Sequence, residues 1–105
     1  MSAPSAPPAE PPLILVADDS QLEQRYVGRL LEQSGWRVAF ARNGEEALAA
    51  VARAEPALLL TDMNMPKMDG LTLVEEVRAR FPRVPVVLMT GSGNDRVAVA
   101  ALKAG

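Results

Sequence analysis

The chain has 105 residues, 49% of them apolar and 23% charged, and a formal net charge of −2, which suits one soluble globular domain. It contains no Cys and no His, and this excludes disulfides, thiolate or imidazole nucleophiles and the usual zinc sites. Without a basic stripe there is no sign of nucleic-acid binding, and no apolar stretch reaches the roughly 18 residues of a membrane span.

The first twelve residues, MSAPSAPPAEPP, hold five of the nine prolines. We expect residues 1–12 to form a disordered or polyproline-like leader. The leader matches the PxxP pattern of SH3-type ligands, but nothing else supports that reading, and we interpret it as a tethering tail. Because it lacks the basic and apolar regions of a signal peptide, we predict a cytoplasmic protein.

Four short runs predict β-strands. Three are apolar throughout, as inner strands of a parallel sheet are: LILVA from residue 13, ALLLT from residue 57 and VPVVLMT from residue 84. The fourth, WRVAFA from residue 36, alternates in polarity and suits an edge strand.

Stretches with helical spacing follow the strands. The two clearest apolar faces consist of Leu22, Tyr26, Leu30 and Leu31, and of Leu71, Val74, Val77 and Phe81. Capping-box patterns begin at Ser20 (with Glu23) and Asn43 (with Glu46), and Gly35 and Pro82 stand where helices end. The last segment, NDRVAVAALKAG from residue 94, predicts a helix that reaches Gly105.

This alternation of strands and helices predicts a parallel sheet with helices on both faces. In such sheets, ligands bind beyond the carboxyl ends of the strands. Asp18 and Asp19 follow the first strand, Asp62 follows the third, and Thr90 ends the fourth. Each residue alone is more simply a helix cap or a turn residue, but their common position predicts a site.

If the first and third strands are neighbours, three carboxylates crowd into one pocket. Two charges about 4 Å apart near a protein surface repel by about 4 kcal/mol, so such a cluster needs a cation or shifted pKa values. Because only oxygen ligands are present, the cation that fits is Mg²⁺, most commonly used beside a phosphoryl group.

At these positions the sequence resembles the receiver domains of two-component response regulators, the CheY-like family. The matching segments are LILVADDS, LLLTDMNMPKMDGL, VPVVLMTGSG and AALKAG, and the likeness covers residues 13–105. The resemblance implies an α/β, flavodoxin-like doubly wound sheet. Four of its strands are present here and would take the order 2-1-3-4.

The resemblance also implies roles for the candidate residues. Asp62 is the phosphoacceptor, which takes a phosphoryl group from a sensor histidine kinase or a histidine phosphotransfer protein. Asp18 and Asp19 form the acidic pair at Mg²⁺, with Asp19 the direct ligand, and Asn64 supplies its backbone carbonyl. Thr90 is the switch hydroxyl. The chain is then a signalling domain that assists its own phosphorylation, rather than a conventional enzyme.

One departure concerns an essential Lys, which the family carries at the end of a fifth strand. Lys103 does not match it, because Lys103 falls inside the predicted last helix. We therefore expect residues 13–105 to be a receiver domain without its fifth strand and fifth helix, with any output domain beyond Gly105. The run from residue 84 would then form an uncovered sheet edge that promotes association.

Two other functions fit parts of the pattern. Phosphatases of the haloacid-dehalogenase type also use an Asp nucleophile with Mg²⁺, but they carry a second Asp two residues later, where this chain has Asn64. A protein-interaction module that is impaired in phosphorylation is the alternative favoured by the missing Lys.

Overall fold

The computed structural model describes residues 11–91 and 97–102 of the chain. Its strands are β1 (Leu13–Ala17), β2 (Arg37–Ala41), β3 (Leu58–Asp62), β4 (Val86–Gly91) and β5 (Val97–Leu102), and its helices are α1 (Gln21–Gln33), α2 (Gly44–Arg53) and α3 (Gly70–Arg80). The four strands and the first three helices expected from the sequence are confirmed. In the described part of the chain, no helix is long and apolar enough to cross a membrane.

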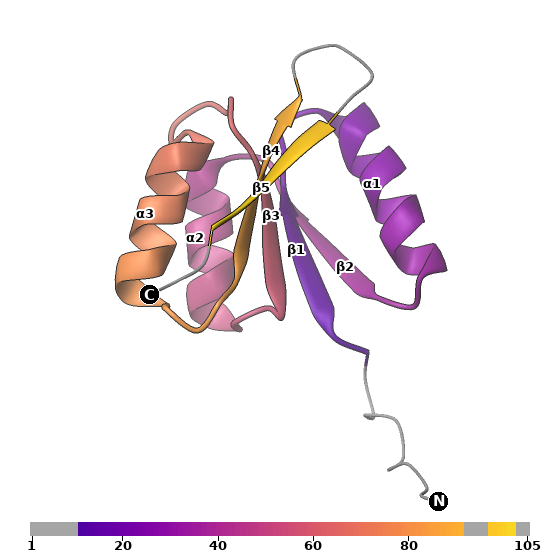
Figure 1. Ribbon diagram of the computed structural model, residues 1–105, viewed down its shortest axis with the longest axis horizontal. Helices are drawn as coiled ribbons and strands as arrows, with labels where there is room; N and C mark the ends of the chain where they lie inside the picture. Colours follow the sequence, from indigo (N-terminus) through magenta and orange to yellow (C-terminus); the bar gives the residue numbers. More distant parts are fainter. Residues whose placement is uncertain (1–10, 92–96, 103–105) are drawn as a thin grey trace, which may run out of the picture.

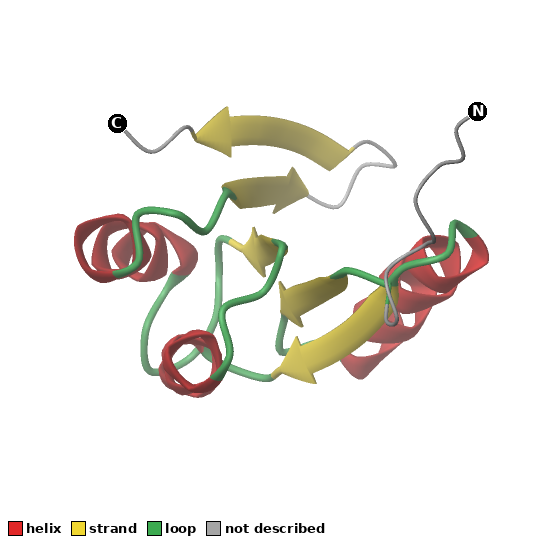
Figure 2. Ribbon diagram, turned by 90° about the horizontal axis from the view of Figure 1, so that it is seen from below, coloured by secondary structure: helices red, strands yellow, loops and turns green. Residues whose placement is uncertain are grey.

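The strands form one sheet in the order β2-β1-β3-β4-β5. The first four are parallel, and this confirms the predicted flavodoxin-like order 2-1-3-4. Helix α1 lies on one face of the sheet, and α2 and α3 cover the other (Figures 1 and 2). Strand β2 is at an edge, as its alternating sequence predicted. The carboxyl ends of all four parallel strands therefore meet at one edge of the sheet.

The main apolar core lies between the sheet and the helices α2 and α3. It consists of Leu15, Ala17, Ala41, Ala47, Val51, Leu59, Leu73, Val74, Val77, Val84, Val86 and Leu88. None of these residues comes from α1. The α1 face predicted from Leu22, Tyr26 and Leu30 is largely exposed, with 76%, 68% and 49% of these residues accessible. The helix instead approaches β2 through Gly28, where an added methyl group would clash with the Phe40 ring.

Three polar side chains cap the helices. Ser20 Oγ accepts a hydrogen bond from Glu23 N at 3.2 Å at the start of α1. Asn43 Oδ1 accepts from Glu46 N at 2.8 Å at the start of α2, and Asp69 Oδ1 accepts from Thr72 N at α3. Since each cap satisfies an otherwise unpaired amide, these residues fix where the helices begin. The first two capping sites are those predicted from the sequence.

The predicted helix at the end of the chain is wrong for residues 97–102. These residues form β5, which pairs antiparallel with β4 so that Val86 lies opposite Leu102 and Gly91 opposite Val97. The predicted uncovered edge at β4 is therefore also wrong, because β5 covers it. The physical reason is non-local: an unpaired strand edge offers backbone hydrogen bonds, and these outweigh the helix propensity of the alanines. The rest of the predicted helix lies outside the described residues.

Breaking β5 should expose the edge of β4. Successive N–H groups of an edge strand alternate between partner and solvent, and proline has no N–H. The double substitution Val99→Pro and Ala100→Pro therefore removes at least one hydrogen bond to β4, whichever residue donates it. We expect a loss of about 1–3 kcal/mol in the free energy of unfolding and concentration-dependent association, measured by urea melts and sedimentation velocity.

The matched control is the double variant Val99→Thr and Ala100→Ser, which keeps every backbone N–H. It should remain as monomeric as the unaltered chain. If the double-proline variant is equally monomeric and equally stable, the pairing of β5 with β4 does not protect this edge.

Candidate functional site

The register of β1 and β3 brings two of the predicted acidic residues together. The two strands are parallel neighbours, with Ala17 opposite Thr61. Asp18 follows directly after Ala17, and Asp62 is the last residue of β3. Both carboxylates therefore leave the sheet at the same edge. This confirms the condition on which the predicted acidic pocket depended, that the first and third strands lie side by side.

Asp18 is held in place by its backbone and its side chain. Only 1% of the residue is exposed. Its N–H donates to the carbonyl of Ala41 at 2.9 Å, and its own carbonyl accepts from Gln24 Nε2 at 2.6 Å. The carboxylate oxygen Oδ1 accepts from Ser20 N at 2.9 Å. Contacts to β2 and to the first turns of α1 thus fix the position of this buried carboxylate.

Burial first, and then the neighbouring Glu23, raise the pKa of Asp18 to about 6, although the hydrogen bond from the Ser20 amide opposes the shift. The Asp62 carboxyl behaves similarly. Its pKa is raised first by burial and then by the charge of Asp18, against the backbone N–H groups of Met63 and Asn64. The Met63 amide donates to Asp62 Oδ1 at 2.9 Å. Both carboxyl groups therefore lie where ionisation is unfavourable without a compensating positive charge.

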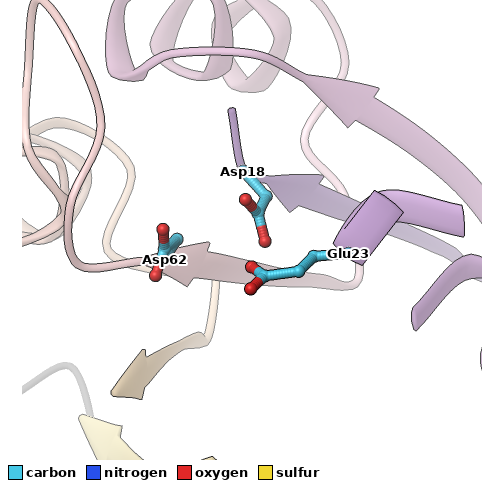
Figure 3. Close-up of side chains that lie close together, drawn as sticks. All are labelled: Asp18, Glu23 and Asp62. Carbon is cyan, nitrogen blue, oxygen red and sulfur yellow. The ribbon is translucent and has the colours of Figure 1, made fainter. Parts of the chain in front are cut away.

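A third carboxylate, that of Glu23, completes the cluster. One carboxylate oxygen from each of Asp18, Glu23 and Asp62 lies within 4.8 Å of the others. Figure 3 shows the Glu23 side chain reaching from α1 toward the other two. Glu23 was not predicted as a site residue, because its position matches the Glu of a capping box that begins at Ser20. The sequence feature that could have indicated a role at the site is the position of Glu23 in the first turn of the helix that follows Asp18 and Asp19.

The other predicted residues lie around this cluster. Asp19 is exposed, outside the group of three, although its charge raises the pKa of both Asp18 and Asp62. Asn64 is exposed in the segment after β3. The backbone of Thr90 comes one residue after Met89, which lies opposite Asp62 in the sheet, so this part of β4 reaches the same edge. Lys103 is outside the described residues.

Two glycines hold the segment between β3 and α3 close to the site. The Gly70 amide donates to the Met63 carbonyl at 2.9 Å, and a Cβ at Gly70 would clash with the carbonyl of Asp62. A Cβ at Gly44 would clash with the carbonyl of Met68, so this segment also presses against the start of α2. Because larger residues would push the backbone away, the glycines help to fix Asp62.

The donor set indicates which ligand the edge can hold. It offers carboxylate oxygens, and because the chain has no Cys or His it offers no thiolate or imidazole; hard cations such as Mg²⁺ prefer oxygen ligands. A bound cation would offset the mutual repulsion of the crowded carboxylates Asp18, Glu23 and Asp62. The residues present therefore fit a divalent cation.

Comparison with known proteins points to one family. The family model of the response regulator receiver domain matches residues 14–105. Chemotaxis protein CheY1 of Helicobacter pylori (strain J99) is 41% identical over 96 residues, which cover 88% of this chain and 77% of CheY1. The DNA-binding transcriptional regulator NtrC of Salmonella typhimurium is 37% identical over 93 residues, which cover 89% of this chain but only 20% of NtrC.

Solved structures agree with the sequence comparison. The response regulator protein TrrA from Thermotoga maritima, crystallised in complex with Mg²⁺–BeF, superposes with a TM-score of 0.75 at 29% sequence identity. The superposition covers 78% of this chain and 71% of TrrA.

The raised pKa of Asp18 predicts a pH dependence of stability in the absence of divalent cations. Between the ordinary pKa of 3.8 and the folded value of about 6, the folded state binds more protons than the unfolded state. The free energy of unfolding therefore falls as pH rises through this range, and the loss is complete above about pH 6. Asp18→Asn keeps the acceptor for Ser20 N–H and should gain about 1–3 kcal/mol at pH 7 in EDTA.

A carboxylate with the opposite shift serves as the control. The pKa of Asp69 is lowered by its hydrogen bond from the Thr72 amide, so this group adds stability above its unfolded pKa and loses it as pH falls. Asp69→Asn should bring no gain at pH 7. If Asp18→Asn also brings no gain in urea melts, the burial of an ionised Asp18 does not destabilise the fold.

The only Trp should be a poor reporter of this site. Trp36 precedes β2, and the first residue of that strand, Arg37, lies opposite Leu13 at the start of β1. It is therefore at the end of the sheet away from Asp18 and Asp62. We expect Trp36 fluorescence to change little on addition of millimolar Mg²⁺, and a large quench would show that the cation binds elsewhere or that the sheet rearranges.

Proposed function

The chain belongs to the response regulator receiver domain family, and from this membership we propose that it is a phosphoacceptor of two-component signalling. Asp62 would take a phosphoryl group from the phosphohistidine of a sensor histidine kinase or a histidine phosphotransfer protein, in a Mg²⁺-dependent reaction in the cytoplasm. The observation that carries the proposal is the pair of carboxylates, Asp18 and Asp62, at the ends of two neighbouring parallel strands.

Asp18, Asp19, Asp62 and the backbone carbonyl of Asn64 are the proposed ligands of the cation. Receiver domains bind Mg²⁺ at an acidic pocket of this kind. When bound, Mg²⁺ supplies the positive charge that offsets the carboxylates and the phosphoryl oxygens. Asp18 is buried and fixed by Ser20 N–H, so it is preorganised before the cation arrives.

Asp62 is the proposed nucleophile. One of its carboxylate oxygens forms a bond to phosphorus while the bond from phosphorus to the donor imidazole nitrogen breaks, which leaves an acyl phosphate on Asp62. The Met63 amide already holds Oδ1 at 2.9 Å, and this fixes the orientation of the carboxylate. Holding a reactant in the correct orientation is the main contribution a protein makes to phosphoryl transfer.

Thr90 is the proposed switch residue. Its backbone continues β4 past Met89, the partner of Asp62 in the sheet. The hydroxyl would hydrogen-bond a phosphoryl oxygen on Asp62 and so couple phosphorylation to a movement of the chain after β4. Phosphorylation by this route changes a surface that signalling partners read.

Phosphorylation with a small donor tests the proposal. Incubation with acetyl phosphate and Mg²⁺ should add one acid-labile phosphoryl group, seen as the corresponding mass increase of the intact chain, with acetate as the leaving group. Asp62→Asn should abolish the label, because an amide is a poor nucleophile. Asp69→Asn is the matched control, since Asp69 is an exposed cap in the same connection, and it should label like the unaltered chain.

Thr90→Ala should label to within a few-fold of the unaltered chain but lose the conformational response, measured as a difference in amide hydrogen exchange with and without donor. Undiminished labelling of Asp62→Asn would disprove the assignment of the phosphoacceptor.

A further inference from the structure

Glu23 is the one member of the acidic cluster that the proposed function does not use. It is the third residue of α1, and its backbone N–H donates to Ser20 Oγ at 3.2 Å. Its carboxylate oxygen lies within 4.8 Å of oxygens from both Asp18 and Asp62, although Glu23 itself is exposed. The carboxylate therefore stands at the rim of the site, on the solvent side of the two partly or fully buried groups.

The ordinary role for a Glu at this helix position is unavailable in this fold. In a capping box, the carboxylate turns back to accept from the N–H of the capping Ser. Here Ser20 N–H donates to Asp18 Oδ1 at 2.9 Å. Figure 3 shows Glu23 directed at the acidic cluster. Among residues 11–91 and 97–102, no Lys or Arg forms an ion pair with it.

We propose that Glu23 is an outer carboxylate of the cation site, which strengthens Mg²⁺ binding and opposes the approach of anionic phosphodonors. The proposal deepens the proposed function and rests on it. The number of negative charges around a site is a main determinant of divalent-cation affinity. A further negative charge at the rim also repels a phosphodonor that must pass it to reach Asp62.

The Glu23 charge is expected to favour Mg²⁺ binding but to slow phosphorylation. A purely structural role for Glu23 would not produce these opposite effects. Removing the charge with Glu23→Gln should weaken Mg²⁺ binding by about three- to tenfold, as expected for one exposed charge a few ångströms from a divalent ion. At saturating Mg²⁺, the same variant should be labelled by acetyl phosphate faster than the unaltered chain, by about two- to fivefold. A damaged site would lose both binding and labelling.

The experiment measures Mg²⁺ affinity by isothermal titration calorimetry and labelling rate by intact mass, on the full chain. The matched control is Glu32→Gln, an exposed Glu on the same helix. Nine residues separate it from Glu23, which at 3.6 residues per turn places it on the opposite face of α1. Net charge changes equally in both variants. A second variant, Glu23→Asp, keeps the charge on a shorter side chain and should retain most of the affinity.

The outcomes are distinct. Weaker Mg²⁺ binding and faster labelling in Glu23→Gln alone support the proposal. Equal effects in Glu23→Gln and Glu32→Gln assign the change to net charge and overturn it. Unchanged affinity in Glu23→Gln, with a folded helix by circular dichroism, also overturns it while leaving the phosphoacceptor function intact. If the unaltered chain neither binds Mg²⁺ nor labels at Asp62, the proposed function itself fails.

Discussion

The candidate site depends on holding the carboxylates of Asp18 and Asp62 side by side, the first buried and the second partly buried. An ionised group in such surroundings is unfavourable unless hydrogen bonds or opposite charges compensate. Here the compensation comes from backbone amides, those of Ser20 and Met63, and it is incomplete, since the pKa of both carboxyl groups remains raised. The apolar core between the sheet and the helices α2 and α3 provides the stability that this arrangement removes.

The central part of the fold could be predicted from the sequence because its signals are local. Inner strands such as β1 and β3 are apolar throughout, so their pattern does not depend on knowing their neighbours. The carboxylates at their ends follow from chain position alone. The hydrophobic pattern does not show which strands are neighbours. That prediction came from the family resemblance. The pairing of Ala17 with Thr61 is the fact that turns two separate carboxylates into one cluster.

The errors arose where a residue outside the local pattern decides the structure. Residues 97–102 have the composition of a helix, but the open edge of β4 makes them a strand. The apolar residues of α1, including Leu22 and Tyr26, have the spacing of a core face, yet no helix packs beside α1 on its side of the described structure. Glu23 matched a capping box, but Asp18 takes the amide that the box would use. At β5 the deciding partner is distant in the chain, whereas at Glu23 it is Asp18, two residues before the cap.

Burial and charge play different parts in this cluster. Asp18 is almost fully buried, so its charge carries a large desolvation penalty, and its hydrogen bonds with Ala41 and Ser20 fix its position. Glu23 is exposed, so its own charge carries little desolvation penalty, while its field still reaches the cluster because Coulomb interactions fall only as the inverse of distance. An exposed rim carboxylate can therefore adjust cation affinity with less effect on folding than a change at the buried Asp18. On this argument, affinity in such a site is more readily varied at the first turn of α1 than at the strand ends that hold the buried pair.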